Sequence, residues 1–231
     1  MPKLGLGYSI LGTYFQLRLG IALGSLLLPF VLWLGGMWLE DLDLQPSLSD
    51  YYREGDGAMR DPFVGVLVFI GLSLVLYKGY HWLENLLLNV CGIAAVGVAF
   101  VPVHEEYDWI PFGLDQYVHG FFAVVAFISA GIVAVFLSRE SLKYIEDVKS
   151  IRYKILYWLY PALGVMMVSV LALTIILALA GVIENGVFWM ESVAVWLFAL
   201  YWLIKSWELF VTERRLGTVT IEWIREKVST P

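Results

Sequence analysis

Long apolar runs separated by short polar connectors dominate this sequence. A helix rises about 1.5 Å per residue, so about 20 apolar residues cross the roughly 30 Å of hydrocarbon in a bilayer. The runs predict six membrane-spanning helices. Glu191 is the one acidic residue that lies well inside a run. The predicted spans cover about 19–39, 62–80, 83–103, 117–138, 155–183 and 187–206.

Composition supports an all-α integral membrane protein, with residues 1–231 forming one bundle and one domain. Hydrophobic residues make up 60% of the chain and the mean hydropathy is +0.75, which excludes an ordinary soluble domain. The first apolar run begins near Leu19 and is too long for a cleaved signal peptide, so we expect a retained span. Cys91 is the single cysteine, which excludes an intramolecular disulfide and a cysteine-based metal cluster.

Charge sets the expected orientation. When the connectors are assigned alternately to the two sides, 13 of the 15 basic residues fall on one side, and only Arg53 and Arg60 fall on the other. Lys and Arg concentrate in cytoplasmic loops, so both termini are predicted to be cytoplasmic. The acidic connectors then lie outside, in a bacterial or archaeal plasma membrane. Residues 207–231 are expected to form a solvated cytoplasmic tail, the alternative being an interfacial helix around Trp223.

Polar side chains gather at the predicted outer face. Asp61, His119 and Glu191 are candidate catalytic residues, and together with His104 they are a candidate site for a divalent metal, since imidazole and carboxylate are suitable ligands. The alternative interpretation is that Asp61 caps the helix that Pro62 begins, and that His119 makes a polar contact. The same face carries further candidates for lipid or ligand binding: Ser47, Ser49, Tyr51, Tyr52 and Arg60.

A second polar group lies toward the predicted cytoplasmic face. Asn85 and Asn89 follow His81 at four-residue intervals and share one helix face. They are expected to form either hydrogen bonds between helices or a polar pocket, in which Lys78 would meet a lipid phosphate. Lys205 lies on the helix face of Glu191, and it is either a ligand-binding residue or a side chain that extends to the headgroups.

Several short motifs resemble the DRAM-like superfamily of six-span membrane proteins, which includes GPI-lipid-remodelling proteins and phosphoinositide regulators. They are PSLSDYY at residues 46–52, the Pro-Phe pair at 62–63, the Asn- and Gly-containing third span, and HGFFA at 119–123. Bacterial members of unassigned function are similar in RDPFVG, YKGY and FWMESVAVW. The resemblance implies a six-helix fold and a lipid-connected role. The acidic stretch at residues 53–59 departs from the family pattern.

These observations lead to three functional hypotheses. The first is a protein that binds or modulates lipid through a polar pocket between helices. The alternative is a membrane-embedded hydrolase or transferase with the outer His and carboxylate residues, although no HExxH, HxxxH or serine nucleophile-elbow motif is present. A small-molecule transporter is the second alternative, for which an inverted repeat is lacking. Membrane lipids are the expected partners, nucleic acid is not, and a divalent metal is compatible with the outer residues but not expected.

Overall fold

The computed structural model describes residues 2–101, 115–145, 150–181 and 186–229. Within these residues the fold is helical and contains no strand. The α-helices are α1 (Pro2–Leu39), α2 (Arg60–Leu76), α3 (Trp82–Phe100), α4 (Asp115–Ile132), α5 (Arg139–Ile145), α6 (Ile151–Leu179) and α7 (Val187–Ser229). A 3-10 turn, η1 (Asp50–Tyr52), precedes α2, and a π-helical turn, η3 (Val133–Leu137), continues α4.

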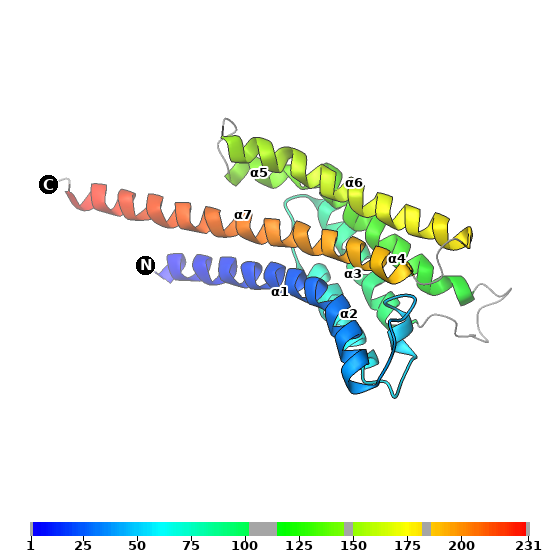
Figure 1. Cartoon of the computed structure of the whole chain (residues 1–231). Helices are drawn as coiled ribbons and strands as arrows, with labels where there is room; N and C mark the ends of the chain where they lie inside the picture. The colour runs from blue at the N-terminus through cyan, green and yellow to red at the C-terminus, as the bar shows by residue number, and fades with distance from the viewer. Residues whose placement is uncertain (1, 102–114, 146–149, 182–185, 230–231) are drawn as a thin grey trace.

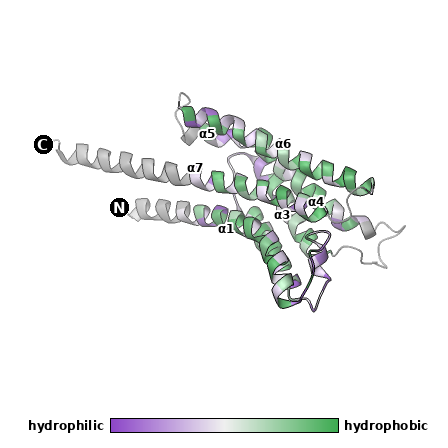
Figure 2. Cartoon of the chain, viewed as in Figure 1, coloured by the Kyte–Doolittle hydropathy of each residue, from purple (hydrophilic) through white to green (hydrophobic). Residues whose placement is uncertain are grey.

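Five of the described helices are long and apolar enough to cross a membrane, which makes the chain an integral membrane protein. The qualifying segments are Gly12–Leu39, Trp82–Phe100, Tyr117–Leu142, Ile151–Leu179 and Val187–Glu208. Helix α2 has 17 residues, or about 25 Å of rise, and falls just short of the others in length. Figure 2 shows apolar residues throughout the packed part of the bundle and polar residues in the segment between α1 and α2.

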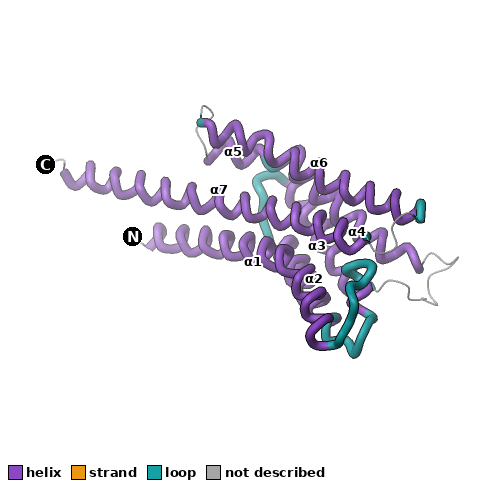
Figure 3. The backbone as a smooth tube through the Cα atoms, in the orientation of Figure 1, coloured by secondary structure: helices purple, strands orange, loops and turns teal. Residues whose placement is uncertain are grey.

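The six long helices pack as a closed ring. Helix α1 contacts α2 and α7, α3 lies between α2 and α4, and α6 connects α4 to α7. The start of α1 and the end of α7 lie at the same end of the bundle (Figure 1). The connector at residues 40–59 lies at the other end, and the short connector at 77–81 lies nearer the termini (Figure 3). The ring surrounds a central cavity that is partly open to the outside.

Pairs of glycines allow two close helix contacts in this ring. A Cβ on Gly92 of α3 would lie 2.4 Å from the carbonyl oxygen of Gly71 on α2. On the other side of the ring, a Cβ on Gly164 of α6 would lie 2.9 Å from the carbonyl oxygen of Gly131 on α4. Small residues let membrane helices approach at their backbones, where van der Waals contact supplies much of the packing energy. Gly92 therefore allows α2 and α3 to pack in close contact.

Several helix boundaries differ from those predicted. Helix α1 begins at Pro2 rather than near residue 19, and α7 continues past residue 206, so the predicted tail at 207–231 is helical as far as Ser229. Helix α2 ends at Leu76, and Tyr77 has an extended backbone, so the segment 77–81 is a connector and not the end of a span. The predicted spans begin or end beside Arg18 and Lys205, whereas both side chains are buried inside continuous helices.

Candidate functional site

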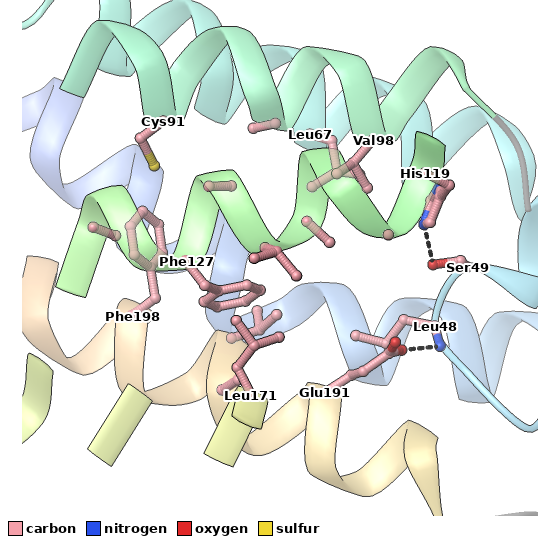
Figure 4. A pocket seen from close by; sticks show the side chains of 18 of the residues that line it. Leu48, Ser49, Leu67, Cys91, Val98, His119, Phe127, Leu171, Glu191 and Phe198 are labelled. Carbon is pink, nitrogen blue, oxygen red and sulfur yellow. Dashed lines mark hydrogen bonds between the residues drawn. The ribbon is translucent and has the colours of Figure 1, made fainter. Parts of the chain in front are cut away.

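A central cavity of about 580 Å³ lies among the six long helices. Aliphatic and aromatic side chains from every one of these helices form most of its wall, including Leu28, Leu67, Val98, Phe127 and Leu171. Figure 4 shows that Cys91 and Phe198 lie toward one end, while Ser49, His119 and Glu191 lie at the other. The cavity is therefore apolar along its length and polar at one end.

Two hydroxyl groups in the cavity wall do not change this polarity. Ser25 donates to the carbonyl of Ile21 at 2.8 Å, and Thr174 donates to the carbonyl of Val170 at 2.8 Å. Each hydroxyl is thereby satisfied by its own helix. The polar end differs, because its hydrogen bonds connect segments that are distant in the sequence.

The polar end joins the connector between α1 and α2 to helices α4 and α7. Leu48 donates its backbone N–H to Glu191 Oε2 at 2.8 Å. The next residue, Ser49, has its hydroxyl 2.8 Å from His119 Nε2. The other ring nitrogen of His119, Nδ1, lies 2.5 Å from the carbonyl oxygen of Val101. Ser49 and His119, predicted to lie at one face of the membrane, are thus in direct contact.

A compact turn presents Leu48 and Ser49 to the cavity. The carboxylate of Asp50 accepts hydrogen bonds from the backbone N–H and the hydroxyl of Ser47, at 3.0 and 2.8 Å. Tyr51 is fully buried, its ring lies against Gly36 of α1 and Phe188 of α7, and its hydroxyl accepts from Gln45 N–H at 3.3 Å. Burial raises the pKa of the Tyr51 phenol, which stays neutral. The turn is therefore anchored to both flanking helices.

The predicted cluster of Asp61 with His119 and Glu191 is not formed. Asp61 lies in the first turn of α2, and its side chain is 83% exposed beside Arg60, at 3.6 Å. The residues that line the cavity include His119 and Glu191 but neither Arg60 nor Asp61. The helix begins at Arg60 and not at Pro62, which turns the Asp61 carboxylate outward. Tyr52 packs against Phe63 rather than facing the cavity, with ring centroids 6.3 Å apart.

The predicted metal site lacks the ligands it requires in the described part of the chain. No group of three His, Cys, Asp or Glu side chains there is arranged to hold a metal ion. Of the four predicted ligands, Asp61 points away and His104 lies outside the described residues. The two that line the cavity, His119 and Glu191, are each hydrogen-bonded to the connector between α1 and α2.

The stripe of polar residues on α3 binds a neighbouring connector. His81 precedes the helix and its Nδ1 accepts from Leu83 N–H at 3.1 Å, while Asn85 accepts from Gly79 N–H at 2.6 Å. The Asn89 amide nitrogen is positioned to donate to the carbonyl of Val75 on α2 at 3.1 Å. Lys78 is exposed on this connector. These contacts agree with the helix-packing interpretation, since neither asparagine lines the central cavity.

Lys205 does not extend to the surface but is 3% exposed within a buried ion cluster, which we define as Arg18, Lys205 and Glu208. Its Nζ lies 3.4 Å from Glu208 Oε2 and donates to the carbonyl of Ser138 at 3.1 Å and to the hydroxyl of Ser141 at 2.5 Å. The predicted contact of Lys205 with the headgroups is therefore wrong, and its role in ligand binding stays a prediction. A buried ammonium is tolerated only where it is paired and hydrogen-bonded.

The buried ion cluster also connects α1 to the connector that follows α2, to α6 and to α7. Arg18 donates to the Lys205 carbonyl oxygen at 2.7 Å and to the hydroxyl of Tyr77, and Tyr160 donates to Glu208. Arg18 directly precedes the apolar run that begins near Leu19, and no role was predicted for it. The available signal was the Lys205 and Glu208 pair, spaced three residues apart near the end of an apolar run.

Comparison of this chain with protein-family models, with curated proteins and with solved structures found no match. The geometry of the cavity and its polar end is therefore the basis for inferring a function.

Proposed function

We propose that this protein is a six-span membrane protein that binds a lipid, with an acyl chain in the central cavity and its polar portion beside Ser49, His119 and Glu191. The observation that supports the proposal is the distribution of polar and apolar residues along the cavity. Its volume is about 580 Å³, its wall is apolar, and its polar groups lie at one end. This volume is within the range of about 300–1,000 Å³ typical of small-molecule sites. A lipid tail and its ester group have the same division of apolar and polar character.

Exposure of the lining residues supports entry from the membrane. Tyr117 and Phe121 on α4 line the cavity and are 62% and 63% exposed, and Ile175 on α6 lines it and is 37% exposed. We propose that a lipid tail enters sideways from the hydrocarbon between α4 and α6, without passage through water. The resemblance to the DRAM-like superfamily agrees with a lipid-connected role.

For the topology, we propose that α2 is the second of six spans and that both termini are cytoplasmic. Helix α2 closes the ring between α1 and α3, and its outward face carries Phe69, Leu72 and Leu76, each at least 46% exposed. The common position of the start of α1 and the end of α7 supports an even number of crossings (Figure 1). The bias of basic residues supports cytoplasmic termini.

Cysteine labelling in intact cells tests this topology. On a Cys91→Ala background, Asp56→Cys is expected to react with a membrane-impermeant maleimide from outside, and Ile151→Cys only after permeabilisation. Asp56 and Ile151 are both exposed, so access to reagent depends on the side of the membrane. The reverse labelling pattern contradicts the orientation, and labelling of both from outside contradicts the span count.

Native mass spectrometry of the purified protein tests lipid binding. The Ala126→Trp variant places an indole in the cavity wall, and the matched Ala172→Trp variant places one on the exposed surface of α6. The wild type and Ala172→Trp are expected to carry a stoichiometric lipid, and Ala126→Trp to lose it. Equal lipid content in all three proteins contradicts the proposal. Elemental analysis of the same samples tests the metal-dependent alternative, for which a stoichiometric divalent metal would be required.

A further inference from the structure

The polar end of the cavity contains a serine and a histidine in a defined hydrogen-bonding order. A backbone carbonyl only accepts hydrogen bonds, so the contact between the Val101 oxygen and His119 Nδ1 requires a proton on Nδ1. In the neutral imidazole, Nε2 then carries a lone pair. The Ser49 hydroxyl, 2.8 Å away, donates its proton toward that lone pair. This order is the one found between a serine nucleophile and its general base.

The surroundings hold both side chains in place. Ser49 and His119 are each 8% exposed, so neither is a freely rotating surface group. The Val101 carbonyl occupies the position that an orienting carboxylate takes in other serine nucleophile sites, and it fixes the tautomer and the ring plane. Glu191 accepts from the N–H of Leu48, the residue before Ser49, and is a positioning residue for the nucleophile rather than a partner of the imidazole.

We propose that Ser49 and His119 form a nucleophile and general-base pair that removes a long-chain acyl group from a lipid ester, the acyl chain being held in the central cavity. The inference rests on the proposed function, because the cavity must hold the acyl chain for the ester carbonyl to reach Ser49. Both side chains line the cavity at its polar end (Figure 4). A chain that lies along the apolar wall therefore leaves its carboxyl ester at the serine hydroxyl.

The reaction has two acyl-transfer steps and no redox change. Ser49 Oγ attacks the ester carbonyl carbon while His119 Nε2 accepts the hydroxyl proton. The bond from that carbon to the lipid alcohol oxygen breaks, and Nε2 returns the proton to the departing alcohol, which leaves an acyl-Ser49 ester. Water, or the hydroxyl of a second lipid, then attacks the acyl carbon and gives its proton to Nε2. The bond to Ser49 Oγ breaks, Nε2 protonates this oxygen, and the free acid or the new ester departs.

A long-alkyl fluorophosphonate tests the nucleophile in the purified full-length protein. The expected result is a covalent adduct on Ser49 by peptide mass spectrometry, and none in Ser49→Ala. His119→Ala is expected to react at least about a hundredfold more slowly, the range for loss of a general base. The matched control is Ser206→Ala, since Ser206 is also buried but does not line the cavity and donates to the carbonyl of Trp202 on its own helix, and it is expected to label as the wild type does.

Two further measurements separate a catalytic pair from a structural one. Ser49→Cys is expected to form an acyl adduct at residue 49 with an acyl-chain thioester probe, because the thiol replaces the hydroxyl as the nucleophile. If the hydroxyl had only a structural role, the cysteine would form no such adduct. Phospholipid with a labelled acyl chain is expected to yield free fatty acid in the wild type, or a labelled second lipid when an acceptor is supplied. Thermal unfolding of every variant shows whether a loss of reaction reflects a loss of folding.

The outcomes distinguish this inference from the proposed function. An unlabelled but folded wild type that still carries lipid in native mass spectrometry overturns the acyl transfer and leaves lipid binding standing. An adduct on Ser49 that is unaffected by His119→Ala overturns the role of the histidine. An unlabelled protein that carries no lipid overturns both proposals.

Discussion

The carboxylate of Glu191 accepts a hydrogen bond from the backbone N–H of Leu48 at 2.8 Å, across 143 residues of sequence. It is the acid placed well inside an apolar run, and its partner is a backbone group of the connector between α1 and α2. Because Ser49 is the adjacent residue and contacts His119, the carboxylate on α7 determines the position of a hydroxyl that meets α4. Three distant segments thus converge on one end of the cavity.

Replacing Glu191 tests this positioning role. Glu191→Ala removes the acceptor for Leu48 N–H, which costs about 1–3 kcal/mol for an unsatisfied buried donor. The connector at residues 40–59 is then expected to be cleaved faster by a protease, and fluorophosphonate labelling of Ser49 to fall. Glu191→Gln keeps an oxygen acceptor and is expected to behave more like the wild type. Equal protease sensitivity of Glu191→Ala and the wild type would contradict the role.

The contact between Gly71 and Gly92 predicts a strong effect of a single methyl group. Gly92→Ala places a Cβ 2.4 Å from a backbone carbonyl that no rotamer change relieves, so α2 and α3 must separate. We expect a destabilisation of about 1–3 kcal/mol, the range for overpacking. Gly65→Ala on α2 is the control, because its Cβ meets nothing within 4 Å. Thermal unfolding followed with a thiol-reactive dye at the buried Cys91 measures both variants, and an unchanged melting temperature for Gly92→Ala would refute the contact.

The Lys205 and Glu208 pair predicts non-additive losses. Lys205→Met leaves Glu208 with less positive charge nearby, and Glu208→Gln does the reverse, so each is expected to cost about 3–5 kcal/mol. The double variant removes one charge of each sign and is expected to cost less than the sum of the two. The double-mutant cycle is read from the same thermal unfolding assay. Strictly additive losses would show that the two side chains do not act as a pair.

Arg18→Lys tests the geometry of the guanidinium rather than its charge. Two different nitrogens of the planar Arg18 guanidinium contact Tyr77 and the Lys205 carbonyl. The single ammonium nitrogen of a lysine does not reproduce this two-pronged geometry. We expect Arg18→Lys to lose about 1–3 kcal/mol of stability, the cost of a buried group left without its hydrogen bond. A melting temperature equal to that of the wild type would mean that only the charge matters.

Much of the fold followed from the sequence, because the hydrocarbon thickness sets the length of an apolar run whatever its neighbours are. The helical class and the five longest membrane-crossing segments are of this kind. The helix ends were less accurate. A charge normally ends a span, but Arg18 and Lys205 find hydrogen-bond partners inside the protein, and α1 and α7 continue past them.

The candidate site was only partly predictable for a geometric reason. The sequence placed Ser49, His119 and Glu191 at one face of the membrane, which follows from topology alone. Asp61 has the same predicted depth, yet its place on the first turn of α2 turns it outward. Depth in the membrane gives one coordinate, and the direction around the helix decides which residues meet. The carbonyl of Val101 has no sequence signal, because every residue carries one.

The hydrogen bond from Arg18 to the backbone of Lys205 has a consequence for biosynthesis. The ribosome adds Lys205 to the chain 187 residues after Arg18, and Glu208 follows it. Throughout that interval the arginine of the nascent chain must remain in the water-rich interface or be shielded by the insertion machinery, because its buried partners do not yet exist. Placement of α1 at its final depth is therefore coupled to completion of α7, and a chain released before residue 208 keeps a cation that membrane quality control is able to detect.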